Sequence, residues 1–193
     1  DYFQYTSHTS QLYWVYNQAI GGWLATMLLY AQKTNRALAL IIGANFITST
    51  IPSLGLIPLA ICFALRNHKQ GQPNGKFHLA AFVREVLTVE NIAGVVVAGV
   101  SYLYLGSNNA GQRLSTLFHI ANIVTPIWLL FIVCEVLVFY LLLFKYHGKE
   151  PLFYVMLGLQ LVLPWLRIGE KADLCMRSSI PLLVILYLWV AQA

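Results

Sequence analysis

The segment "ALALIIGANFITSTIPSLGLIPLAICFAL", residues 37–65, decides how this chain crosses a membrane. It carries no charge and is too long for one straight crossing, which takes about 20 helical residues. Pro52 interrupts the segment because proline lacks a backbone donor, and Ser49, Thr50 and Ser53 can bond the backbone groups that it frees. Two interpretations remain open: one long helix kinked at Pro52, or two short spans that meet in a tight turn.

The composition of the whole chain is typical of membrane proteins. Of the 193 residues, 59% are hydrophobic and 10% are charged, whereas a typical soluble domain is about 25% charged. A soluble domain of this size could not bury so many apolar helices on all sides. The net charge of +5 suits basic membrane loops and does not indicate nucleic-acid binding. Three scattered cysteines define neither a disulfide framework nor a metal site, and we expect no metal or cofactor.

Further apolar segments bring the expected total to about six or seven membrane segments. They cover residues 12–31, 89–106, 117–144, 152–166 and 174–192, and a polar loop is expected at residues 66–76. Residues 77–88 have an apolar stripe opposite Arg84 and Glu85, which predicts an interfacial helix. The fold class is therefore an all-α polytopic transmembrane helix bundle that forms one domain over residues 1–193. Because the chain begins at Asp1 rather than Met, we expect it to be a fragment of a longer chain.

The distribution of basic residues favours two crossings within residues 37–65. A single crossing divides the 12 Lys and Arg residues evenly between the two sides, whereas two crossings put eight on one side and four on the other. The uneven division fits the excess of Lys and Arg in cytoplasmic loops. The larger, cytoplasmic group is Lys33, Arg36, Arg66, Lys69, Lys76, Arg84, Lys145 and Lys149, and the smaller group is Arg113, Arg167, Lys171 and Arg177.

The segment "GEKADLCMRSSIP", residues 169–181, places charge between two apolar runs. In a structural interpretation, Asp173 caps the last helix and pairs with Arg177 one turn later, while Arg167 and Lys171 belong to a solvated turn. In a functional interpretation, Arg167, Lys171 and Arg177 surround an anionic group of a ligand, with a helix N-terminus adding donors. The position of Arg177 inside the final helix favours function, because an intramembrane arginine marks a candidate site.

Two other polar clusters are candidates. Aromatic residues around Trp14 form an interfacial belt, but Asn17 and Gln18 continue into the first helix, where they either hold a neighbouring helix or bind a hydroxyl-rich ligand such as a sugar. Glu135 lies in the middle of the apolar segment 117–144. A structural hydrogen bond between helices is the first interpretation for this carboxyl, and proton transfer is the second.

Three segments together resemble part of a known family: "YWVYNQAIGGWLATMLL", "STIPSLGLIPLAI" and "GEKADLCMRSSIPLLVIL". They are similar to the later part of large bacterial polytopic membrane proteins that look broadly like the GT-C class of glycosyltransferases. The residues that fit the last signature are Asp173, Met176, Arg177, Ser179 and Pro181, whereas Lys171, Ala172, Tyr16 and Asn17 depart from the family pattern. The resemblance implies a bacterial inner-membrane location and transfer of sugars from lipid-phosphate donors. In this class the catalytic acid lies in an early loop, so the resemblance implies a C-terminal portion without that acid.

The resemblance and the candidate residues together give the expected function. We expect a GT-C-like glycosyltransferase portion, or an envelope-polysaccharide protein, that uses a polyprenyl-phosphate-linked sugar. The expected phosphate ligands are Arg177, Arg167 and Lys171, with Asp173 orienting Arg177, and the expected sugar contacts are Trp14, Asn17 and Gln18. The expected partners are membrane lipid and helices from the rest of the chain or another subunit.

Two alternatives remain: a secondary transporter or flippase with a helix broken at residues 49–55, and a structural subunit without catalysis. No phosphate-binding loop or hydrolase arrangement is present in the sequence, so ATP-driven work and hydrolysis by this chain alone are not expected.

Overall fold

The computed structural model describes residues 5–72, 77–107, 118–120, 125–168 and 173–193. The first half contains α1 (His8–Trp14), α2 (Tyr16–Ala31), α3 (Leu38–Thr48), α4 (Thr50–Gly71), α5 (Leu79–Val86) and α6 (Val89–Gly106). The second half contains β1 (Phe118–Ile120), α8 (Thr125–Ile132), the π-helical turn η1 (Val133–Leu137), α9 (Val138–His147), α10 (Pro151–Val162), the 3₁₀ turn η2 (Leu163–Trp165), β2 (Leu166–Ile168), α11 (Asp173–Ser178) and α12 (Ile180–Gln192).

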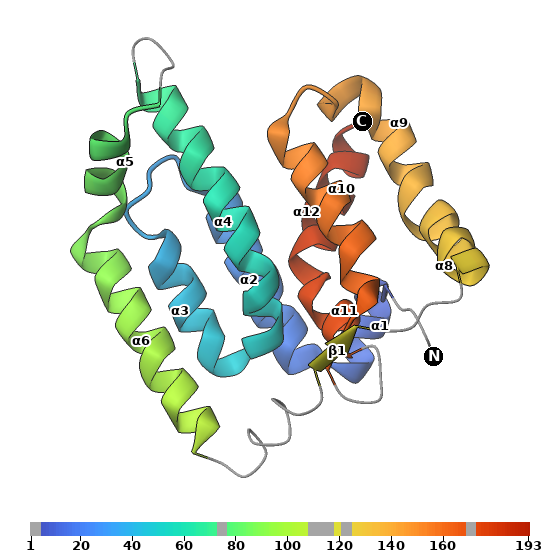
Figure 1. The fold of residues 1–193 in the computed structure, drawn as a ribbon, viewed down its shortest axis with the longest axis horizontal. Helices are drawn as coiled ribbons and strands as arrows, with labels where there is room; N and C mark the ends of the chain where they lie inside the picture. The colour runs from blue at the N-terminus through green and yellow to red at the C-terminus, as the bar shows by residue number, and fades with distance from the viewer. Residues whose placement is uncertain (1–4, 73–76, 108–117, 121–124, 169–172) are drawn as a thin grey trace.

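The architecture is helical, as the sequence predicted, apart from one short antiparallel ladder in which β1 pairs with β2. Long helices lie side by side and alternate in direction along the chain, with α3, α4 and α6 on one side of Figure 1 and α9, α10 and α12 on the other. α12 packs against both α2 and α4 and so joins the two sides. Nearly all of its apolar side chains are buried, including Ile180, Leu182, Ile185 and Trp189.

Three helical segments are long and apolar enough to cross a membrane: Thr50–Gly71, Val89–Gly106 and Pro126–His147. The outward faces of the two outer segments carry large exposed apolar side chains, such as Val100 and Leu103 on α6 and Leu141 on α9, which are 62%, 71% and 75% exposed. Apolar exposure on this scale is unfavourable in water and favourable against lipid. These features support a membrane protein.

Residues 37–65 form two helices rather than one. α3 ends at Thr48 and α4 starts at Thr50, and the intervening Ser49 has φ −144° and ψ 62°. The observed break at Ser49 falls within the predicted broken segment 49–55, at its first residue, three residues before Pro52. Pro52 lies in the first turn of α4, where a backbone N–H has no helical partner in any case, so proline does not disturb the helix there.

Four other predicted segments differ from the structure. The predicted span 12–31 is divided at Val15 into α1 and α2. Residues 66–71, predicted as loop, continue α4. Within the predicted helix 117–144, residues 118–120 form β1 instead, and the described helix α8 starts at Thr125. The predicted last helix is interrupted at Ser179, two residues before Pro181, which occupies the first turn of α12.

The segment before α2 folds back against the bundle. The Gln11 side chain donates from Nε2 to the Thr6 carbonyl (2.7 Å) and accepts at Oε1 from Trp23 Nε1 (2.9 Å). The His8 ring contacts the rings of Trp23 on α2 and Tyr187 on α12, with centroid distances of 4.8 and 4.7 Å. Burial lowers the pKa of His8 below its usual range. α1 is therefore a packed part of the fold.

Small residues bring the helices into close contact. A Cβ on Gly94 would collide with the α3 backbone at Ala39, and one on Gly43 would collide with the backbone of Gly94. On α2, a Cβ at Gly22 would lie 3.0 Å from Ile180 of α12. Such contacts allow van der Waals packing between helix backbones, which drives helix association inside lipid.

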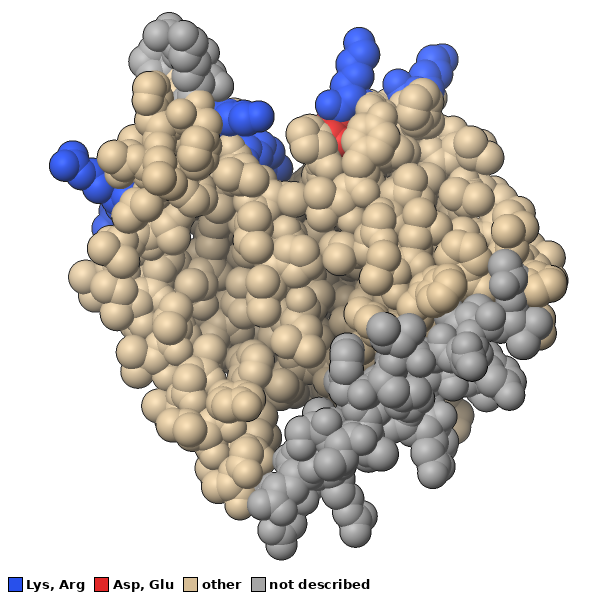
Figure 2. All heavy atoms as spheres, in the orientation of Figure 1, with Lys and Arg blue, Asp and Glu red and all other residues tan. Residues whose placement is uncertain are grey.

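Basic residues gather at one end of the bundle. Figure 2 shows the visible Lys and Arg side chains along the upper edge, where α2, α4 and α9 end and where α5 lies. The described members are Lys33, Arg36, Arg66, Lys69, Arg84, Lys145 and Lys149. Among the described side chains, Arg177 is the one Lys or Arg at the other end, in α11. This arrangement is the one expected if residues 37–65 cross twice.

Candidate functional site

Arg177 and Gln18, separated by 159 residues in sequence, meet at the end of the bundle opposite the basic edge. Arg177 Nη1 donates to Gln18 Oε1 at 3.4 Å, and Arg177 Nη2 lies 3.7 Å from Asp173 Oδ1 one turn earlier. The Arg177 side chain is 25% exposed and that of Asp173 42% exposed. Arg177, from the predicted site at residues 169–181, therefore meets Gln18, from the predicted polar cluster at the start of the first helix.

The guanidinium of Arg177 retains unused donor capacity. Its two contacts are long for charge-assisted bonds, which are usually about 2.7–2.9 Å. Its Nε is buried without a hydrogen-bond partner among the described residues. A guanidinium has five N–H donors in a planar fork that matches the oxygens of a phosphate. Arg177 can therefore donate hydrogen bonds to an anionic oxygen without losing a strong existing bond.

A buried polar cluster at the α3–α4 break is hydrogen-bonded to the backbone of Gln18. The Ser49 hydroxyl donates to the Gln18 carbonyl at 3.1 Å, and Asn45 Nδ2 donates to Ser53 Oγ at 2.9 Å. Ser49 and Ser53 are fully buried, and a Cβ on Gly21 would lie 2.8 Å from Asn45 Oδ1. The Ser53 hydroxyl donates in turn to the Ser49 carbonyl at 2.9 Å, so the cluster bonds the backbone at the α3–α4 break and connects it to α2. Asn45 was not predicted as a site residue, although a lone asparagine in an apolar run is a recognisable signal.

α11 is held against α4 at very close range. A Cβ on Gly55 of α4 would collide with the Ser178 carbonyl at the end of α11. Ser178 and Ser179 are buried, and their hydroxyls donate to the Leu174 and Met176 carbonyls within the same segment. The backbone that carries Arg177 is thus positioned by the helix that follows the break.

The remaining predicted residues do not join this contact among the described side chains. Trp14 is 81% exposed, and Asn17 is exposed with its Oδ1 accepting from the Gln18 backbone N–H at 3.0 Å. Arg167 lies in β2, paired with His119 of β1, and its side chain is outside what the structure describes. Lys171 lies outside the described residues altogether.

Glu135 occupies a different place. It lies in the π-helical turn η1 and lines a cavity of about 340 Å³ together with polar side chains of the N-terminal segment, including Thr6 and Ser10, and with Tyr187 of α12. No hydrogen bond to another helix is found for Glu135 among the described residues, so the predicted structural bond is not present there. π-helical turns occur frequently at functional sites.

Comparisons with known proteins do not assign this chain to a family. No family model, curated protein or solved structure matches this chain. Within the described part of the chain, no three His, Cys, Asp or Glu side chains come together as metal ligands would. The function is therefore inferred from the residues themselves.

Proposed function

We propose that this chain is a membrane portion of a GT-C-like glycosyltransferase, or of an envelope-polysaccharide protein, in which Arg177 binds the phosphate of a polyprenyl-linked sugar. The observation that carries the proposal is the contact of Arg177 with Gln18 and Asp173, which leaves donor capacity on a largely buried guanidinium. An arginine in a membrane bundle is costly unless an anion or a polar network compensates it. Here both neighbours are too distant to satisfy it fully.

The proposal includes a topology of seven crossings in a bacterial inner membrane. The crossings are α2, α3, α4, α6, α8–α9, α10 and α11–α12, with the basic edge in the cytoplasm. α3 has 11 residues and is about 16 Å long, which is shorter than a hydrocarbon core of about 30 Å. The lower end of α6 extends beyond the α3–α4 turn in Figure 1. We infer that the break at Ser49, and Arg177 near it, are recessed from the extracytoplasmic surface.

In this scheme the chain binds and orients the donor rather than cleaving it. Asp173 limits the motion of Arg177 through their long ion pair, and the Gln18 amide presents a hydrogen-bonding group beside the phosphate position. Arg167 and Lys171 complete the phosphate site, and Trp14 and Asn17 contact the sugar. The catalytic acid of the GT-C class is assigned to another part of the enzyme.

A direct binding experiment tests this proposal. The purified chain in phosphatidylcholine nanodiscs is titrated with a short-chain polyprenyl phosphate, and bound ligand is counted by native mass spectrometry. We expect Arg177→Gln to weaken binding about tenfold or more, and Arg177→Lys to give an intermediate loss because the planar fork is lost while charge remains. Lys149→Gln, an equal change of charge at the other end, serves as the control. Equal binding by wild type and Arg177→Gln refutes the proposal.

A secondary transporter is the second candidate, and the position of Glu135 favours it. A carboxyl in an apolar helix, at a π-helical turn and facing a polar cavity, has the features of a proton-coupling residue. That candidate predicts that Glu135→Gln abolishes proton movement into reconstituted vesicles while Arg177→Gln does not. A structural subunit predicts that both substitutions change only stability or assembly.

A further inference from the structure

A second cavity, lined by charged and polar residues, lies at the basic edge, at the far end of the bundle from Arg177. Its volume is about 450 Å³, and it is bounded by the α2–α3 turn, the last turns of α4, and the α5–α6 region. Three cations line it, namely Lys33, Arg36 and Arg84, together with Glu85 and Asn67. The proposed function uses none of these residues.

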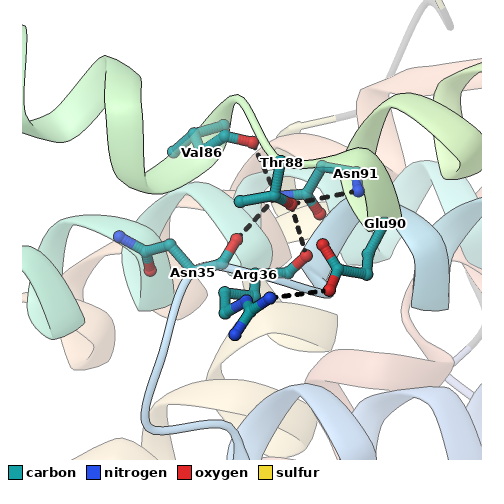
Figure 3. A network of polar contacts seen from close by, with 6 residues as sticks. All are labelled: Asn35, Arg36, Val86, Thr88, Glu90 and Asn91. Atoms are coloured by element: carbon teal, nitrogen blue, oxygen red, sulfur yellow. Dashed lines mark hydrogen bonds and ion pairs between the residues drawn. The ribbon is translucent and has the colours of Figure 1, made fainter.

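Hydrogen bonds hold the walls of this cavity in place (Figure 3). Asn91 Nδ2 donates to the carbonyls of Asn35 (2.6 Å) and Val86 (2.8 Å), and the Thr88 hydroxyl donates to the Arg36 carbonyl (2.8 Å). These bonds join the α2–α3 turn to the α5–α6 turn. The cavity is therefore preformed and is not a gap between independent loops.

The one carboxyl in the lining is already engaged. His68 Nδ1 lies 3.0 and 3.1 Å from the two Glu85 oxygens, and Asn35 Nδ2 donates to Glu85 Oε2 at 3.0 Å. Because His68 Nε2 accepts from the His78 backbone N–H at 3.2 Å, Nδ1 carries the proton and donates to Glu85. The carboxylate thus has little capacity left to bind a cation from solution.

The cations are less fully engaged than this carboxyl. Arg36 pairs with Glu90 at 3.1 Å, a contact in which both side chains are substantially exposed and which is weak for that reason. Lys33 and Arg84 form no ion pair with another described residue. The free charge in the cavity is therefore positive.

Asn67 gives an independent indication of a ligand. It is 6% exposed and lines the cavity, yet neither Oδ1 nor Nδ2 has a hydrogen-bond partner among the described residues. Buried amides are almost always hydrogen-bonded. The amide N–H groups of Asn67, next to unpaired cations, suit an oxyanion that bridges them.

We propose that this cavity binds a phosphate group of the cytoplasmic leaflet, carried by an anionic phospholipid headgroup. α5, which forms one wall, has no buried residue, and it exposes Leu79 and Val83 by 66% and 48%. An amphipathic helix of this kind lies in the headgroup region with its apolar side toward the acyl chains. A phospholipid beside α5 has its phosphate at the level of the cavity and its chains along the apolar side chains. Inorganic phosphate has the same chemistry and is the other source to test.

Paired charge variants test the proposal in the intact chain. Nanodiscs of phosphatidylcholine with a small fraction of phosphatidylglycerol are compared with phosphatidylcholine nanodiscs plus millimolar inorganic phosphate, and retained ligand is counted by native mass spectrometry. The variant Lys33→Gln/Arg84→Gln removes two charges from the cavity. The control Lys145→Gln/Lys149→Gln removes two charges from the same edge outside it. Asn67→Leu removes the unpaired amide without changing charge.

We expect the Lys33/Arg84 double variant and Asn67→Leu to retain about tenfold less phosphatidylglycerol than wild type, and the control to match wild type. If the cavity variants lose binding of inorganic phosphate but not of phosphatidylglycerol, the cavity is a phosphate site whose ligand is soluble. Equal retention by wild type and the cavity double variant in both arms overturns the proposal, as does an equal loss in the control. The double variant changes exposed side chains only, so it remains informative if Asn67→Leu does not fold. Binding here does not depend on Arg177, so either proposal can fail alone.

Discussion

Replacing Asn91 with alanine should destabilise the fold more than any comparable substitution of an exposed polar residue. Asn91 lies in the first turn of α6 and is 4% exposed. Its Nδ2 donates to the carbonyls of Asn35 and Val86, and its Oδ1 accepts from the Ala39 backbone N–H at 2.8 Å, at the start of α3. One side chain therefore satisfies three backbone groups from three different segments (Figure 3 shows the carbonyl side of this network).

The magnitude follows from the groups that alanine leaves unpaired. A buried backbone group that loses its partner costs about 1–3 kcal/mol, and three groups are affected. The network lies beside the exposed side chains of Arg36 and Glu90, where water can replace part of the lost bonding, so we take the low end of the range. The expected destabilisation is about 3 kcal/mol. In a chain of this size it lowers the midpoint of thermal unfolding by about 6–12 °C.

The assay is thermal unfolding of the purified chain in detergent, followed by tryptophan fluorescence. Asn17→Ala is the matched control, because among the described residues the exposed Asn17 side chain bonds only the adjacent backbone N–H, and its change should stay within about 0.5 kcal/mol. If Asn91→Ala unfolds within 2 °C of wild type, roughly the effect of 0.5–1 kcal/mol, the network does not hold the α2–α3 turn to α6 and the reasoning fails.

Three further predictions concern close packing, pH and topology. Gly55→Ala should destabilise the chain by about 1–3 kcal/mol in the same assay because it displaces the Ser178 carbonyl, whereas Gly99→Ala, with open space around it, should not. The pKa of His8 is lowered on folding, so its contribution to stability is present above about pH 6.5 and is lost as the pH falls through the folded-state value. His8→Gln should reduce the fall of the unfolding midpoint at acid pH. An unchanged fall would contradict the assignment of this pH dependence to His8. In a cysteine-free background, a cysteine at Lys69 and one at Asp173 should react with an impermeant maleimide from opposite sides of the membrane, and labelling from the same side would contradict the topology.

The sequence predicted the features of the fold that depend on local pattern. α6 has the predicted limits because Thr88 caps its start and its apolar run is uninterrupted. The division of residues 37–65 followed from counting charge on each side. Its exact position did not, because a proline in the middle of an apolar run looks like a break, whereas in the first helical turn it costs no hydrogen bond.

The candidate site was predictable only in part, for a physical reason. The sequence marks Arg177 and Gln18 separately, but no periodicity connects these residues of α11 and α2, which meet because α12 packs against α2. The polar residues after Arg66 resemble a loop in sequence, yet His68 is fully buried because α5 covers it. Tertiary contacts determined these outcomes, and hydropathy does not encode them.

Photoaffinity mapping tests the central claim, that Arg177 binds a lipid-linked phosphate, most directly. A polyprenyl phosphate with a diazirine next to the phosphate is incorporated with the chain into nanodiscs, irradiated, and located by peptide mass spectrometry. The proposal predicts labelling of peptides from α11 and the start of α2, lost on addition of excess unlabelled polyprenyl phosphate and reduced about tenfold in Arg177→Gln. Labelling confined to the basic edge around Arg84, or unaffected by Arg177→Gln, would contradict it.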